Sequence, residues 1–249
     1  MQNYCKTIGA IVAASALVAG TASAEIEYEI HTGYSSLYLF RGTDLGQDLI
    51  EAGVDMSTEY MGLGLSAGAW YGSFGNKVAP ATGLSVDTDF SELDIYGEVS
   101  KDLGYFTAAI GYIAYLNRDA EAAGLLNQNF ANDDAQEVYF SVAQTYYGID
   151  FSLTYFWDIE ADNNGYTELA MGKGFELSSC LTLNTGVAIA YLWEEGDFAH
   201  ITAKVALDWA FTETATLSPF VAASFELEDG YNGGGDDELV AGSMLSVSF

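Results

Sequence analysis

The chain has 249 residues, half of them hydrophobic, and a formal net charge of −29. Such an acidic excess excludes nucleic acid and anionic membrane surfaces as partners bound through charge. Tyr, Phe and Gly are plentiful, with 17, 14 and 27 copies, whereas Pro occurs only twice. This composition favours an all-β protein built from short strands.

The first 24 residues predict a secretory signal peptide. Lys6 precedes an apolar stretch at residues 8–19, and the segment ends in the small-residue cleavage pattern Ala22-Ser23-Ala24. A retained membrane helix is the alternative, but the stretch is short for a span and polar residues follow at once. Cleavage leaves residues 25–249 as one predicted domain, with 6 Lys and Arg against 36 Asp and Glu, a formal charge of −30.

After residue 24, apolar and polar residues alternate in twelve runs, as strands with one apolar face require. In the run at residues 50–57, Ile50, Val54 and Met56 share one face, and Glu51 and Asp55 share the other. The predicted strands cover about residues 26–40, 50–57, 63–71, 92–99, 106–114, 137–142, 149–157, 167–171, 181–193, 200–209, 217–225 and 239–249.

The connections between these runs alternate in length. Tight turns are predicted near residues 61–62, 102–104, 146–147, 178–179 and 212–213, and mostly longer polar connections at 42–47, 75–89, 117–134, 158–165, 194–198 and 227–238. Short periplasmic turns and longer external loops are the layout of an outer-membrane barrel. We therefore predict a transmembrane, antiparallel, up-and-down β-barrel of twelve strands in the outer membrane of a Gram-negative cell.

A soluble β-sandwich explains the alternation equally well, so other features must separate the two folds. Aromatic residues gather near both ends of the predicted strands, where a membrane meets water. The external set is Tyr38, Phe40, Tyr71, Tyr155, Trp157, Tyr191 and Trp193, and the periplasmic set is Tyr60, Phe106, Phe175, Trp209 and Phe211. Phe249 ends an alternating strand, as in the signal that the barrel-assembly machinery reads. These features favour the barrel, with outer-membrane lipid, periplasmic chaperones and the assembly machinery as partners.

A stretch from Tyr34 to Trp70 contains Tyr38-Leu39-Phe40-Arg41-Gly42, then Gln47 and Gly53-Val54-Asp55. It resembles the TorF-type porins, a glycine-rich family of conserved hypothetical outer-membrane proteins. Residues 92–96, 111–113 and 137–139 are similar to later segments of that family. The resemblance implies an outer-membrane channel.

The sequence offers no catalytic constellation. His31 and His200 lie on predicted strands three apart around the barrel, at least ~14 Å from each other, and so share neither a metal nor a proton relay. Residues 158–165 begin like a calcium loop, but Met171 stands where the twelfth-position Glu is required. We therefore predict no enzyme activity and no cofactor, with structural Ca²⁺ in the acidic loops at 158–165 or 236–238 as a minor alternative.

The alternate residues that are predicted to face the lumen are strongly acidic. The side chains predicted to line the pore are Glu51, Asp55, Glu59, Glu92, Asp94, Glu98, Glu137, Asp150, Lys204 and Asp208. Small residues at Gly64, Ser66 and Gly68 are expected to leave these carboxylates bordering open water. Acidic walls focus a negative potential and favour cations, although a generally acidic exported proteome, as in saline habitats, would explain the charge equally well.

Arg41 lies at the rim, where the first predicted strand meets its loop. It is predicted to form a salt bridge that orders the loop or, alternatively, to steer anions through the mouth. We predict passive diffusion of small hydrophilic solutes, with a preference for cations, through a lumen that is narrow or blocked by its own side chains. The alternatives are a non-channel barrel with adhesive or surface-structural acidic loops and, with least support, a lipid-modifying enzyme.

Overall fold

The computed structural model describes residues 26–75, 89–119, 135–160, 164–227 and 237–249. The predicted signal peptide and much of the long acidic connections lie outside the described residues. Within the described ranges, no helix is long and apolar enough to cross a membrane.

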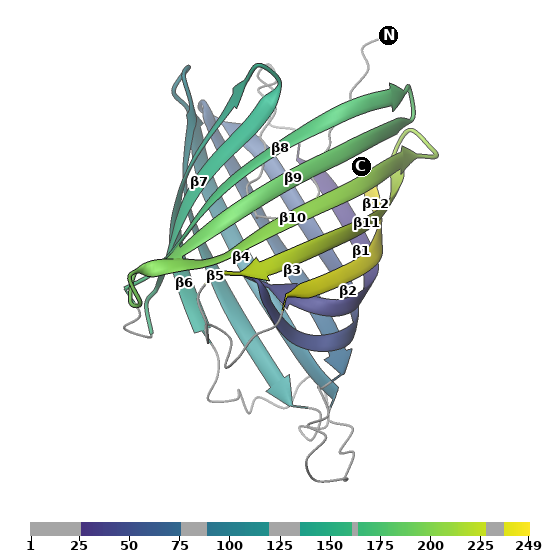
Figure 1. Ribbon diagram of the computed structural model, residues 1–249. Coiled ribbons are helices and arrows are strands. Elements are labelled where there is room, and N and C mark those ends of the chain that lie inside the picture. The colour runs from purple at the N-terminus through teal and green to yellow at the C-terminus, as the bar shows by residue number, and fades with distance from the viewer. Residues whose placement is uncertain (1–25, 76–88, 120–134, 161–163, 228–236) are drawn as a thin grey trace.

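Twelve antiparallel strands pair in chain order, and β1 pairs with β12 to close a barrel (Figure 1). The strands are β1 (Glu27–Phe40), β2 (Thr43–Tyr60), β3 (Leu63–Gly75), β4 (Asp89–Asp102), β5 (Thr107–Asp119), β6 (Ala135–Tyr146), β7 (Ile149–Asp158), β8 (Tyr166–Ser178), β9 (Leu181–Leu192), β10 (Asp197–Ala210), β11 (Ala215–Glu226) and β12 (Glu238–Ser248). The predicted twelve-stranded barrel is confirmed, and the sandwich alternative is wrong because one sheet closes on itself.

One end of the barrel, here called the turn end, carries tight hairpin turns. Met61 and Gly62 have φ angles of 54° and 73°, and Tyr147 and Gly148 have 51° and 70°. Two successive positive φ angles define the type I′ turn, whose twist matches that of paired strands. Both chain ends of the barrel meet here, since the backbone N–H of Phe249 donates to the carbonyl of Tyr28 at 2.8 Å. The opposite end, where β3, β5, β7, β9 and β11 end, is called the loop end.

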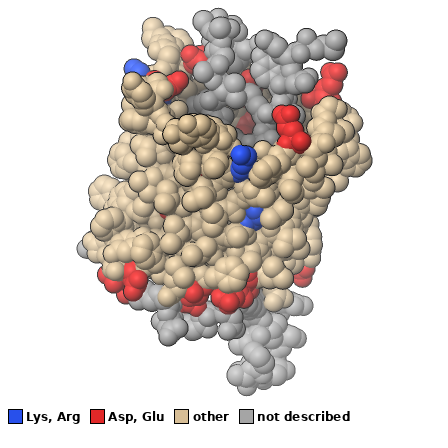
Figure 2. Space-filling view, turned by 45° about the horizontal axis from the view of Figure 1, so that its top comes forward, with Lys and Arg blue, Asp and Glu red and all other residues tan. Residues whose placement is uncertain are grey.

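The face of the barrel seen in Figure 2 carries a broad band of mostly uncharged residues, interrupted by a few Lys or Arg side chains, and acidic residues gather towards both ends. Large aromatic side chains are exposed near each margin, including Trp157 and Trp193 at the loop end and Tyr60 and Trp209 at the turn end. Strand alternation places these rings on the outer face because the polar side chains between them face the lumen.

The tip of the β1–β2 hairpin leaves the barrel wall. Pairing of β1 with β12 stops at Ser35, opposite Gly242, whereas β1 and β2 remain paired as far as Phe40 and Thr43. At the point of departure, the Ser35 hydroxyl donates to the carbonyl of Leu37 at 2.9 Å. We call residues 37–46 the plug hairpin, because its side chains contact the lumen wall instead of continuing the sheet.

Two sequence predictions fail at this hairpin. The external loop predicted at residues 42–47 is a two-residue turn, with φ angles of 49° at Arg41 and 83° at Gly42, and β2 begins directly after it. Tyr38 and Phe40 do not belong to an external aromatic girdle, because the departure from the wall and a register shift after Tyr38 turn both rings inward.

Candidate functional site in the barrel lumen

The plug hairpin is held by a two-pronged ion pair across the lumen. Arg41 Nη1 and Nη2 donate to Glu137 Oε1 and Oε2 on β6, at 2.7 and 2.6 Å. The Tyr115 hydroxyl on β5 donates to the same carboxylate at 2.9 Å. Parallel hydrogen bonds between a guanidinium and a carboxylate are strong and fix the angle of approach.

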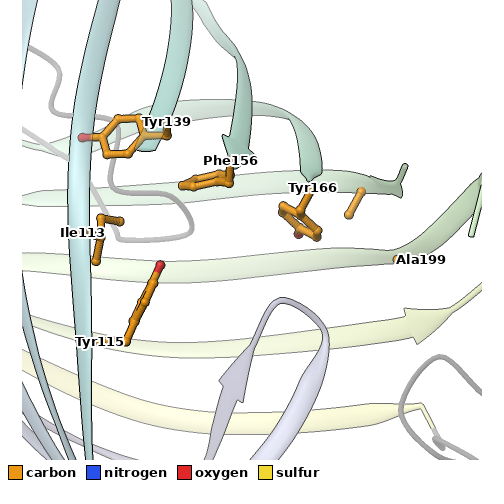
Figure 3. Close-up of a cluster of buried hydrophobic side chains, with 7 residues drawn as sticks. Ile113, Tyr115, Tyr139, Phe156, Tyr166 and Ala199 are labelled. Carbon is orange, nitrogen blue, oxygen red and sulfur yellow. The ribbon is translucent and has the colours of Figure 1, made fainter. Parts of the chain in front are cut away.

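Aromatic rings enclose the Arg41 guanidinium. Its Cζ lies 4.4 Å from the centroid of the Phe156 ring, 4.5 Å from that of Tyr166 and 5.0 Å from that of Phe40. Figure 3 shows Tyr115, Phe156 and Tyr166 projecting from different strands into the same part of the lumen, and Phe40 of the hairpin packs against this cluster. Ring faces attract a cation, and the attraction is largest where water is excluded.

Gly42 brings the turn against β10. A Cβ at this position would overlap the ring of His200. That imidazole is fully buried and belongs to a series of hydrogen bonds. Its Nε2 lies 3.0 Å from the Tyr166 hydroxyl, and its Nδ1 lies 3.1 Å from the Thr202 hydroxyl. The Thr202 hydroxyl in turn lies 2.9 Å from the Ser224 hydroxyl. His200 therefore belongs to the seat of the plug hairpin, and the glycine is required both by φ and by the close approach.

The β1 strand of the plug hairpin also touches the wall, on both of its faces. Tyr38 packs on the rings of Trp70 and Phe74 of β3, with centroids 5.5 and 5.0 Å apart. Leu37 packs with Ala222 of β11 and Val240 of β12. Together with the contacts of Arg41 and Gly42, these place the plug hairpin against both sides of the lumen at this level.

Tyrosine hydroxyls donate to the predicted pore carboxylates. The pairs are Tyr38 with Glu92 at 3.2 Å, Tyr96 with Asp55 at 2.5 Å, Tyr139 with Glu98 at 2.9 Å and Tyr115 with Glu137. Tyr166 donates in the same way to Glu168, which is not in the predicted set. The expectation that small residues leave open water beside the carboxylates is wrong at Gly68, where a Cβ would overlap Tyr96 and Asp55. The tyrosine rings fill that space.

The remaining predicted lumen residues are dispersed. Glu51 accepts from Trp70 Nε1 at 2.7 Å, and Asp208 accepts from Asn184 Nδ2 at the same distance. Lys204 lies 4.4 Å from the Phe220 centroid. Asp94 is half-buried on β4, and two carboxylates are exposed near the turn end: Glu59 on β2 and Asp150 on β7. The strands thus bring Glu92, Glu137 and Arg41 together at the plug hairpin, with Asp94 beside Glu92, whereas Glu59 and Asp150 lie apart from it.

The site contains residues that the sequence did not single out as functional, above all Tyr115, Phe156, Tyr166 and His200. A local signal for the plug existed, because the run Leu37-Tyr38-Leu39-Phe40 lacks the alternation of a wall strand. A continuous apolar run indicates a strand buried on both faces. Of the acidic loops considered for Ca²⁺, residues 161–163 and 236 lie outside the described part of the chain.

Solved structures with this fold include outer-membrane proteins. The COG4313 outer membrane channel from Pseudomonas putida F1 is 10% identical, with 92% of this chain and 97% of that chain covered and a TM-score of 0.59. The NanC porin is 12% identical, with 89% and 98% covered and a TM-score of 0.50. At such low identity the likeness concerns the fold alone. No curated protein matches the sequence.

A family model, described as a bacterial protein of unknown function (Gcw_chp), matches residues 19–225. The match extends from before β1 almost to the end of β11 and so includes the plug hairpin and most of its seat. The chain therefore belongs to the Gcw_chp family.

Proposed function

We propose that this protein is a narrow outer-membrane channel for small hydrophilic solutes, with a preference for cations, whose passage is controlled by the plug hairpin. The largely uncharged outer band, which is free of acidic residues on the face seen in Figure 2 and lies between two aromatic margins, suits a lipid bilayer. The similarity to TorF-type porins at residues 34–70 and the shared fold with the COG4313 channel and the NanC porin support a channel.

The acidic wall is the reason to expect a cation preference. Glu51, Asp55 and Asp208 face the lumen on the turn-end side of the plug hairpin, and Glu92 lies beside the plug itself, where it accepts from the Tyr38 hydroxyl. Carboxylates around a low-dielectric annulus produce a negative potential that raises the local concentration of cations.

The single observation that carries the proposal is the bridge from Arg41 to Glu137 across the lumen. A hairpin that served only the wall would continue the ladder between β12 and β3. Here it crosses the interior instead, and one ion pair in an aromatic cage fixes its tip. An element that crosses the lumen, packs on the wall along its length and is fixed at its tip by one ion pair is suited to controlling passage.

The same observation keeps a second candidate function open. A plug that never leaves its seat would make the protein a closed barrel, whose acidic connections at the loop end would act in adhesion or surface structure. The two functions differ in whether the lumen ever conducts.

Planar lipid bilayers separate the two candidates. The wild-type protein is expected to give small, infrequent current steps, with a reversal potential in a KCl gradient on the cation-selective side. A barrel that stays silent, both as wild type and after the plug is released by substitution, would refute the channel and support the adhesive role.

A further inference from the structure

We propose that Glu29, His31 and Asp55 form a binding site for a divalent transition-metal ion of the Zn²⁺ class, inside the lumen near the turn end. The site lies on the wall portion of β1 and β2, outside the plug hairpin. It does not depend on whether the barrel conducts.

The strand register brings the three side chains to one face. Glu29 and His31 are two residues apart on β1 and both face the lumen, and Asp55 on β2 is the direct cross-strand partner of Glu29. The potential ligand atoms, one from each residue, all lie within 4.8 Å of one another. His31 Nδ1 is 3.3 Å from Asp55 Oδ2. Bonds of ~2.0–2.2 Å to nitrogen and oxygen require only a small contraction of this triangle.

Neighbouring groups already orient the ligands. The Ser248 hydroxyl donates to Glu29 Oε2 at 3.1 Å, and the Tyr96 hydroxyl donates to Asp55 Oδ1 at 2.5 Å. In each carboxylate, one oxygen is thus held by a hydroxyl donor. Hydrogen bonds of this kind fix first-shell ligands in metal sites.

Gly53 provides the space for the imidazole. It is the cross-strand partner of His31, and a Cβ there would overlap the imidazole at Nε2 and Cε1. The ring is therefore seated over a bare backbone position, with Nδ1 directed at Asp55.

The charge of the group favours a divalent ion. Two carboxylates directly opposite each other in a sheet repel, and a protonated His31 would neutralise only one of them. A divalent ion neutralises both and uses the imidazole as a neutral ligand. One nitrogen and two oxygens suit Zn²⁺ and its first-row neighbours, whereas Ca²⁺ takes six to eight oxygen ligands.

The test is a Zn²⁺ titration of the protein, purified in detergent, against a chromophoric chelator. Wild type should bind one Zn²⁺ that millimolar Ca²⁺ does not displace. His31→Gln should weaken this binding by at least ~100-fold, as should Asp55→Asn, and Tyr96→Phe by about 10-fold. The matched control is His200→Gln, which removes the other histidine of the barrel and should leave Zn²⁺ affinity unchanged.

Co²⁺ gives a second readout that does not depend on affinity alone. Its visible absorption should report an imidazole-ligated site in wild type and in the His200→Gln protein, and should be lost in His31→Gln. Circular dichroism and heat-modifiable electrophoretic mobility check that each variant is folded, and Glu29→Gln, which also removes a ligand, replaces His31→Gln or Asp55→Asn if either is not. Equal Zn²⁺ affinity in wild type and the folded His31→Gln protein, or displacement by Ca²⁺, would overturn the proposal. Since no current is measured, failure here leaves the channel proposal untouched.

Discussion

Replacing Arg41 by Asn should release the plug hairpin without damaging its turn. Arg41 occupies the first central position of a type I′ turn, with a φ of 49°, and Gly42 follows it. Asn-Gly is the pair that such turns prefer, so the substitution improves the local conformation while it removes the guanidinium. Any loss of docking must therefore come from the contacts of Arg41 with the lumen wall.

The expected magnitude follows from those contacts. Removing one partner of a buried, hydrogen-bonded ion pair costs about 3–5 kcal/mol, and ring contacts such as those with Phe156 and Tyr166 add about 0.5–2 kcal/mol. A shift of ~3 kcal/mol changes the docking equilibrium about 150-fold. If the plug is undocked in ~0.1% of wild-type molecules, a typical population for a minor state, it would be undocked in roughly 13% of the Arg41→Asn protein.

Open probability in planar bilayers measures this change directly. Arg41→Asn should raise it by one to two orders of magnitude, and Glu137→Gln should act in the same direction because it leaves the Arg41 charge buried and poorly paired. The double variant should gain less than the sum of the two, as expected for residues in direct contact. Arg41→Lys keeps the charge but loses the two-pronged geometry, so it should fall between wild type and Arg41→Asn. A folded Arg41→Asn barrel with wild-type conductance and open probability would refute the role of this ion pair.

Three further outcomes test neighbouring parts of the reasoning. Gly42→Ala would place a Cβ in the His200 ring and should raise open probability. Gly62→Ala lies in the same kind of turn, with no atom within 4 Å of the added Cβ, and should leave open probability unchanged. Equal effects of the two substitutions would refute the role of His200 as the seat of the plug hairpin. In the plug-released background with chelator present, Asp55→Asn should shift the reversal potential in a KCl gradient towards anions, and the shift should shrink at ~1 M salt, where screening falls to ~3 Å; an unchanged potential at low salt would count against the acidic lumen. An impermeant maleimide should reach Cys180, which is exposed at the turn end, only after the outer membrane is permeabilised. On intact cells it should label a Cys180→Ser protein that carries Glu195→Cys at the loop end. The reverse labelling pattern would invert the topology.

The strand pattern was predictable because alternation has a period that few other structures share. At residues 50–56, exposure alternates with the apolar residues as predicted, since cross-strand pairing on both sides keeps β2 flat in the wall there. Turns such as Met61-Gly62 were equally predictable, because a glycine after a polar strand end indicates a hairpin. These inferences needed only local information.

The plug hairpin was not predictable in the same way. Its departure from the wall depends on partners that are far away in the sequence, such as His200, 158 positions after Gly42, and Glu137, 96 positions after Arg41. The two-residue period assigned Tyr38 and Phe40 to the outer face, because that period applies only to a strand that stays in its sheet. The tyrosine–carboxylate pairs were missed for a related reason: residues such as Tyr96 and Asp55 meet across β3, and no local pattern relates their positions.

The departure of the plug hairpin from the wall removes backbone pairing from β12, and this loss can be tolerated only at the loop end. Beyond Ser35, β12 continues to Glu238 without β1 as its partner, and the Ser36 hydroxyl accepts the N–H of Ala241 at 3.1 Å in place of a backbone carbonyl. Unpaired strand edges are not tolerated in hydrocarbon, so this part of β12 must lie at or above the water-facing margin. There, an undocked hairpin has a defined alternative, since extending β1 along β12 would restore the missing ladder. We therefore expect two ordered positions for residues 37–46, one in the lumen and one on the rim, with the Arg41–Glu137 pair and its aromatic cage setting the balance against the recovered backbone hydrogen bonds.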